Sequence, residues 1–206
     1  MILPTLVVNL LVEGDTDEVI IRRVLEYVGL ECGTVYGKHG KSDLLKRLPN
    51  YNQAARFGAW LAVVDLDRDT LYASDFVHNT LPEPMSGMCF RVAVRAIESW
   101  LLADAEHLAA YLGISPTKIP PNPDLEVDPK TTLINLARLS HRKALRQEIV
   151  PRQGSGGRVG PGYTARLIEF VLSSDYTWRP EVAIQHSESL KRCVTALQKL
   201  KNQRLS

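Results

Sequence analysis

The stretch "TLVVNLLVEGDTDE" (residues 5–18) decides the fold, because a nearly continuous apolar run ends in a cluster of carboxylates. The run has the length of one strand and lacks polar alternation, which is typical of a central parallel strand buried on both faces. Four carboxylates follow within six positions: Glu13, Asp15, Asp17 and Glu18. Like charges this close raise one another's pKa unless solvent or a cation takes up the charge. The stretch therefore predicts a buried strand and poses the question of what neutralises its end.

The same pattern recurs along the first half of the chain. A helix is expected after the first strand, ended by Gly29, and a short strand is expected around "CGTVYG". "AWLAVVDLDRD" is a second buried strand that ends in acids, and "CFRVAV" is a third such run. This alternation predicts an α/β fold with a mainly parallel sheet flanked by helices. Since ligand sites of such sheets lie at the carboxyl ends of the strands, we expect Glu13 and Asp65 to meet there.

A proline-rich segment, "IPPNPDLEVDP", separates this part from a second one whose pattern is helical. Asp128 and Pro129 are typical of a capped helix start. We therefore predict a metal-binding α/β domain over residues 1–119 and a basic helical C-terminal extension over residues 129–206 that packs on it.

Charge is distributed unevenly between the two halves. Residues 1–128 hold 11 Lys and Arg against 18 Asp and Glu, whereas residues 129–206 hold 14 against 5. This asymmetry suits a protein that holds a cation with one part and a polyanion with the other. Solvated helix faces are the simpler alternative.

Cysteine spacing and hydropathy limit the other classes. The three cysteines have no CxxC spacing, so neither a disulfide framework nor a zinc site is indicated, and a reducing, cytoplasmic location is expected. No apolar run is long enough to predict a membrane span.

The acids after the first two buried strands carry the predicted chemistry. A glutamate after one strand and an Asp-x-Asp pair after another supply the hard oxygen ligands that Mg²⁺ prefers. Such an ion orients the attacking oxygen in phosphoryl transfer, and a carboxylate not committed to metal can act as general acid or base. Capping of the following helices is the alternative use of these acids.

"VEGDTDE" and "VVDLDRD", each after an apolar strand, resemble the Toprim domain of topoisomerases, bacterial primases and overcoming-lysogenization-defect nucleases. The chain is more similar still to a Toprim-like group of small bacterial proteins encoded beside an ATPase and linked to phage defence. The motifs that carry this likeness are "GKSDLL", "RAIESWLLAD", "DPKTTL", "GPGY" and "WRPEVA". Thr16 and Asp17 stand where topoisomerases carry Ser-Ala, so no topoisomerase activity is implied.

The resemblance implies a role for each acid. Glu13 matches the proposed general acid or base, Asp65 and Asp67 match the metal-binding pair, and Asp69 is the expected third acid. Glu98 is either a further Mg²⁺ or Mn²⁺ ligand, as in some nucleases of this type, or an ion-pair partner of Arg95 three residues earlier.

Basic residues in two glycine-flanked loops are the predicted nucleic-acid contacts. Lys38 and Lys41 lie in "YGKHGKSD" before a helix N-terminus, where phosphate is attracted. Arg152 and Arg158 lie in "PRQGSGGRVGPG", which has five glycines. A plain solvated turn is the alternative for the first loop, and mere mobility for the second.

The sequence thus predicts a Mg²⁺-dependent Toprim-type nuclease that cleaves DNA or RNA as the effector of an antiviral defence system with an ATPase partner. The alternative is a non-catalytic module that holds a metal or nucleotide and docks on that ATPase.

Overall fold

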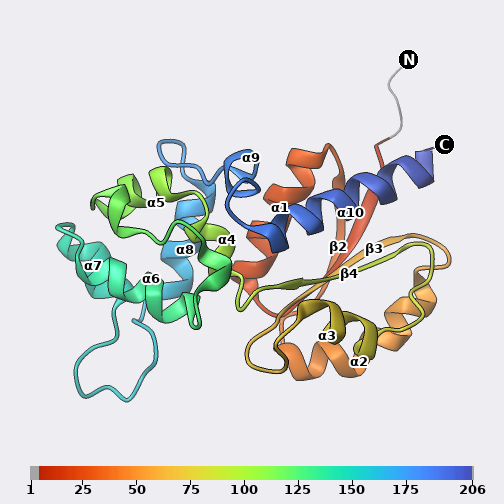
Figure 1. Cartoon of the computed structure of the whole chain (residues 1–206), viewed down its shortest axis with the longest axis horizontal. Helices are drawn as coiled ribbons and strands as arrows, with labels where there is room; N and C mark the ends of the chain where they lie inside the picture. The colour runs from red at the N-terminus through yellow and green to blue at the C-terminus, as the bar shows by residue number, and fades with distance from the viewer. Residues whose placement is uncertain (1–4, 206) are drawn as a thin grey trace. The chain divides into compact units, whose positions relative to one another are not determined.

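The computed structural model describes residues 5–205, and the chain forms two compact units. The first unit consists of residues 1–94 and 189–206, and the second consists of residues 95–188. Residues 1–4 and 206, at the outer ends of the two predicted domains, lie outside the described residues. Figure 1 shows the sheet in the first unit and a set of short helices in the second.

The first unit contains a sheet of four parallel strands in the order β2-β1-β3-β4. Their bounds are β1 (Val7–Val12), β2 (Glu31–Gly37), β3 (Ala59–Asp65) and β4 (Met88–Ala93). The central strands β1 and β3 lie in the runs "TLVVNLLV" and "AWLAVVD", and all but the last residue of β3 is buried. The predicted α/β class with a parallel sheet flanked by helices is confirmed.

Helices cover both faces of this sheet, as Figure 1 shows: α1 and α10 lie on one face, and α2 and α3 on the other. Their bounds are α1 (Asp15–Val28), α2 (Lys41–Ala54), α3 (Ala73–Thr80) and α10 (Glu188–Leu205). Gly29 ends α1 in the left-handed conformation, as the sequence predicts. The core under α2 joins Leu44 and Leu48 to Leu11, Val64 and other side chains of the sheet. A buried sheet flanked on both faces fixes the strand ends, where the acids follow.

The last helix, α10, belongs to the first unit, although residues 95–188 separate it from the rest of that unit in the sequence. Lys201 donates a hydrogen bond to the main-chain oxygen of Val28 at 2.8 Å, and Arg204 donates to that of Ala55 at 3.2 Å. The backbone N–H of Val94 lies 3.5 Å from Ser189 Oγ. The boundaries of the two units therefore differ from those of the predicted domains. Residues 189–206 belong to the unit that contains the sheet, and residues 95–128 belong to the helical unit.

The second unit is helical throughout its regular structure. Its α-helices are α4 (Glu98–Leu102), α5 (Ala105–Leu112), α6 (Pro129–Arg138), α7 (Lys143–Ile149), α8 (Tyr163–Leu172) and α9 (Pro180–Ala183). Asp128 caps α6 by accepting the N–H of Thr131 at 2.9 Å, as predicted. No helix within residues 5–205 is long and apolar enough to cross a membrane.

A buried clamp joins the motifs "RAIESWLLAD" and "WRPEVA" in the second unit. Trp178 is fully buried, and its Nε1 donates to the main-chain oxygen of Trp100 at 2.9 Å. Arg179 donates to both carboxylate oxygens of Asp104, with Nε at 3.1 Å and Nη2 at 2.8 Å. Asp104 also caps α5 through the N–H of His107, so α5 begins as a separate helix after α4. Within these two motifs, Trp178, Arg179 and Asp104 have structural roles.

Candidate functional site

The carboxyl ends of β1 and β3 bring two of the predicted acids together. The two strands are parallel neighbours, and Glu13 follows β1 directly. Glu13 Oε1 accepts a hydrogen bond from the backbone N–H of Asp65 at 2.8 Å, across 52 positions of sequence. Both residues are half-buried. The expected contact between Glu13 and Asp65 is thus present in the structure.

A tight turn after β3 directs the next two aspartates to one point. Asp67 has a φ of 51°, in the left-handed region that Asp tolerates better than most residues. Its Oδ2 lies 3.0 Å from Lys41 Nζ, and Oδ2 of Asp69 lies 2.7 Å from the same nitrogen. Lys41 Nζ also donates to the main-chain oxygen of Asp65. One ammonium group therefore lies among three oxygens at the end of β3.

Lys41 is held as a cation in this position. Burial disfavours its charge, but the hydrogen bonds to Asp69 and Asp67 outweigh that effect and raise the pKa of Lys41. The ring of Phe76 lies 5.0 Å from Nζ and adds a cation–π contact. The side chain is only 15% exposed, against 56% and 45% for the two aspartates.

Lys38 forms ion pairs with two of the acids that follow β1, as Lys41 does with those that follow β3. Its Nζ lies 3.0 Å from Asp15 Oδ1 and also pairs with Glu18. Burial opposes ionisation of Glu18, yet the hydrogen bonds from Lys38 and Arg22 lower the pKa of its carboxyl. Part of the negative charge in the opening stretch is thus taken up by side chains of the chain itself.

The loop that carries these lysines is fixed against β1. The backbone N–H of Lys38 donates to Val12 O at 2.9 Å, and that of Gly40 donates to Glu13 O at 3.1 Å. A Cβ on Gly37 would lie 2.3 Å from Val12 O, so only glycine permits this approach. The loop places Lys38 and Lys41 beside acids, and their predicted contact with nucleic acid stays a prediction.

The donor chemistry at the end of β3 fits a hard divalent cation. Two carboxylates and a carbonyl surround one positive charge, and such oxygens are the ligands that Mg²⁺ prefers. Within residues 5–205, however, no group of three or more His, Cys, Asp and Glu side chains lies close enough together to hold a metal ion. Asp65, Asp67 and Asp69 are the residues that could hold an ion at this place, and they could do so only if Lys41 moved from between them.

Glu98 lies in the second unit and has partners of its own. It is 3% exposed; its Oε1 accepts the hydroxyl of Tyr163 at 2.9 Å and lies 3.5 Å from Lys130 Nζ. Its Oε2 is buried and has no hydrogen-bond partner in the described part of the chain. Glu98 thereby joins three of the motifs, "RAIESWLLAD", "DPKTTL" and "GPGY". Its service as a metal ligand stays a prediction.

The glycine-rich loop after α7 is anchored at its far end. Gly160 and Gly162 donate backbone hydrogen bonds to the main-chain oxygens of Ile149 and Glu148, at 2.9 and 3.0 Å. Arg152 and Arg158 are exposed on the intervening segment. The two arginines are not equivalent with respect to a pocket on α6 and α7, which Arg152 lines and Arg158 does not.

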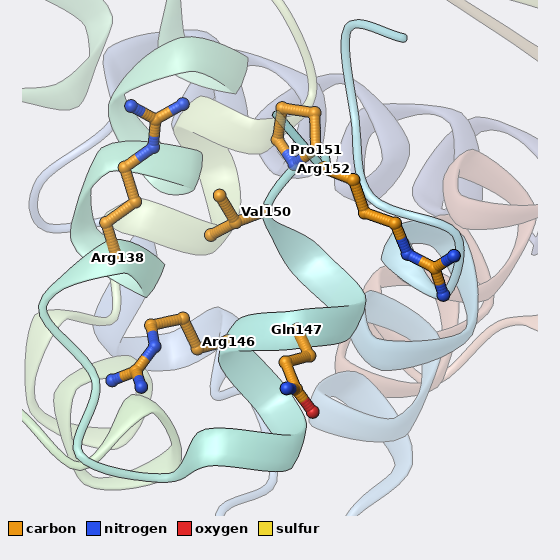
Figure 2. Close-up of a pocket in the computed structure, with 6 residues that line it drawn as sticks. All are labelled: Arg138, Arg146, Gln147, Val150, Pro151 and Arg152. Carbon is orange, nitrogen blue, oxygen red and sulfur yellow. The ribbon is translucent and has the colours of Figure 1, made fainter. Parts of the chain in front are cut away.

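Two further arginines on that pocket, Arg138 and Arg146, were missed by sequence reasoning (Figure 2). They come from different helices, and the only sequence signal was the excess of basic residues after position 128.

Comparison of the chain with family models, with curated proteins and with solved structures finds no match. Evidence for a function therefore comes from the arrangement of acids at the carboxyl ends of β1 and β3 and from the sequence resemblance.

Proposed function

We propose that the protein is a Toprim-like, Mg²⁺-dependent nuclease that hydrolyses phosphodiester bonds in DNA or RNA. The observation that carries the proposal is the hydrogen bond between Glu13 and the backbone of Asp65 at the carboxyl ends of β1 and β3. Ligand sites of parallel α/β sheets lie at this edge. The loop that follows β3 adds Asp67 and Asp69 at the same place.

Each residue has a distinct role in the proposed reaction. The N–H of Asp65 orients the carboxylate of Glu13, which would accept a proton from the attacking water or donate one to the leaving oxygen. Asp65, Asp67 and Asp69 would hold the metal. A bound Mg²⁺ supplies charge neutralisation at the phosphate. Lys41, released from the aspartates, carries a positive charge to the same edge and can contact a substrate phosphate.

The wider context follows from the resemblance and is part of the same proposal. Proteins of the similar group are encoded beside an ATPase and linked to phage defence, so we infer an effector that acts with an ATPase partner. Arg152 and Arg158 in the glycine-rich loop would contact the nucleic-acid backbone.

A binding module that does not cleave is the second candidate, and Lys41 favours it. Its ammonium group already satisfies Asp67 and Asp69, so the loop is stable with no further cation. Such a module would hold a metal or a nucleotide and dock on the ATPase. It would bind Mg²⁺ or nucleic acid and leave the strand uncut.

Cleavage of end-labelled single- and double-stranded DNA and RNA, with Mg²⁺ or Mn²⁺, tests the proposal. Glu13→Gln should lower the cleavage rate by at least about 100-fold, the scale of general acid–base catalysis. Asp75→Asn, an exposed acid of the same unit, is the matched control and should leave the rate unchanged. Wild-type protein that cuts none of these substrates, or a Glu13→Gln variant that cuts as fast as wild type, would refute the proposal.

A further inference from the structure

The second unit contains a pocket of about 610 Å³ whose charged lining is entirely basic. Its lining residues are Arg138, Arg146, Gln147, Val150, Pro151 and Arg152. They come from α6, α7 and the segment that follows α7. In the view of Figure 2, Arg138 and Arg146 stand on one side of Val150 and Arg152 stands on the other.

The positive charge of this pocket is not neutralised by the protein. Among the described residues, neither Arg138 nor Arg152 has an ion pair or a side-chain hydrogen bond. Arg146 donates only to a carbonyl, the main-chain oxygen of Ser140 at 2.6 Å. The one carboxylate between positions 129 and 152 is Glu148, and Arg166 holds its Oε2 at 2.5 Å. The pocket therefore retains its positive charges for an external anion.

The carbonyl groups at the end of α7 do not oppose an anion. The last carbonyls of a helix carry partial negative charge and repel anions. Here the N–H groups of Gly160 and Gly162 cover those of Ile149 and Glu148. The helix dipole explains why basic residues end α6 and α7, but it does not explain Arg152, which lies beyond α7.

The size and the lining indicate more than a bare anion. Pockets for small ligands commonly have volumes of about 300–1,000 Å³, far more than one phosphate group needs. Val150 and Pro151 supply an apolar wall, and the amide of Gln147 can both donate and accept a hydrogen bond. Guanidinium groups match phosphate in geometry.

We propose that this pocket binds the phosphate of a nucleoside phosphate, either a free nucleotide or the end of a nucleic-acid strand, through Arg138, Arg146 and Arg152. This rests on the nucleic-acid contact proposed for Arg152 and deepens it. The acids at the end of β3 have no part in it, so metal is not required.

Binding in EDTA tests the pocket separately from cleavage. The probes are ATP, measured by calorimetry, and a fluorescent single-stranded 12-mer with a 5′-phosphate, measured by anisotropy and competed with ATP. The Arg138→Gln, Arg152→Gln double variant should raise the Kd of a bound probe at least about tenfold, the scale of two lost charge-assisted contacts. Lys143→Gln, which removes an exposed charge of α7 outside the pocket, should change the Kd about twofold or less.

The outcomes separate the sources of the phosphate and the two proposals. Binding of ATP identifies a free nucleotide, whereas binding of the 12-mer without competition by ATP identifies a strand end. Wild-type protein that binds neither probe at millimolar concentration overturns the proposal. So does a folded double variant whose Kd changes no more than that of Lys143→Gln. Wild-type protein that binds a probe in EDTA but cuts no DNA or RNA with Mg²⁺ or Mn²⁺ would refute the proposed nuclease and would leave the proposed phosphate pocket supported.

Discussion

Lys41 is the residue whose replacement is most informative, because it holds the position proposed for the metal. Lys41→Met keeps most of the side-chain length and removes the charge. Two ion pairs with partly exposed aspartates are lost. At about 3 Å a unit charge pair is worth about 1.4 kcal/mol in water, and ordering and salt reduce such pairs to about 0.2–1 kcal/mol each. We expect the metal-free variant to lose about 0.4–2 kcal/mol of unfolding free energy, or about 1–8 °C of Tm.

The same energy should reappear as metal affinity. Wild type has to move Lys41 away from Asp67 and Asp69 before an ion can use their oxygens, whereas the variant does not. A difference of about 0.4–2 kcal/mol corresponds to about 2- to 30-fold tighter Mg²⁺ binding.

Calorimetry with MgCl₂, and thermal unfolding at increasing MgCl₂, measure this effect. Lys46→Met, an exposed lysine on the same helix, is the matched control and should leave affinity within about twofold of wild type. A Lys41→Met variant that binds Mg²⁺ no more tightly than the control would show that the ammonium and the metal do not share a position. Asp67 and Asp69 would then not be the ligands of Mg²⁺.

Two other predictions concern stability in the second unit. Asp104→Asn should cost about 3–5 kcal/mol of unfolding free energy in urea titrations, because it breaks a hydrogen-bonded ion pair whose carboxylate is 0% exposed. Arg179 then keeps the exposed Glu106 as a charge partner. A loss under 1 kcal/mol would contradict the role given to the pair of Asp104 and Arg179. The hydrogen bond from Arg166 holds the pKa of Glu148 below its ordinary value of about 4.5, so this pair stabilises the fold above that pH and its contribution is lost as the pH falls further. Glu148→Gln should therefore be less stable than wild type at pH 7, with the difference shrinking below about pH 4.5; a difference that stays constant down to pH 3 would contradict the ion pair.

Local pattern predicted the sheet well, for a physical reason. A strand buried on both faces has to be apolar throughout, so β1 and β3 are visible as runs in the sequence. Parallel pairing then places their carboxyl ends at one edge, which is why the contact between Glu13 and Asp65 could be expected.

Partners that depend on long side chains could not be predicted in this way. The loop of Lys38 and Lys41 is visible from its glycines, but which carboxylates each ammonium group reaches depends on the turn after β3 and on α1. The set of Arg138, Arg146 and Arg152 is brought together by two helices and a loop, and no spacing in the sequence marks it. Nor does the sequence show that Trp178 is fully buried and bonded to the main chain of Trp100, which lies 78 positions earlier.

The return of α10 to the sheet has a consequence for synthesis on the ribosome. A chain emerges from its N-terminus, and domains generally fold as units while they emerge. The second unit is continuous, so it can fold once residue 188 has emerged. The first unit has its four strands early, but its helix of residues 188–205 comes last, and until then one face of the sheet lacks this cover. The unit whose synthesis begins first is therefore completed last. A nascent chain stalled within the second unit would carry the acids that follow β1 and β3 on an incomplete scaffold.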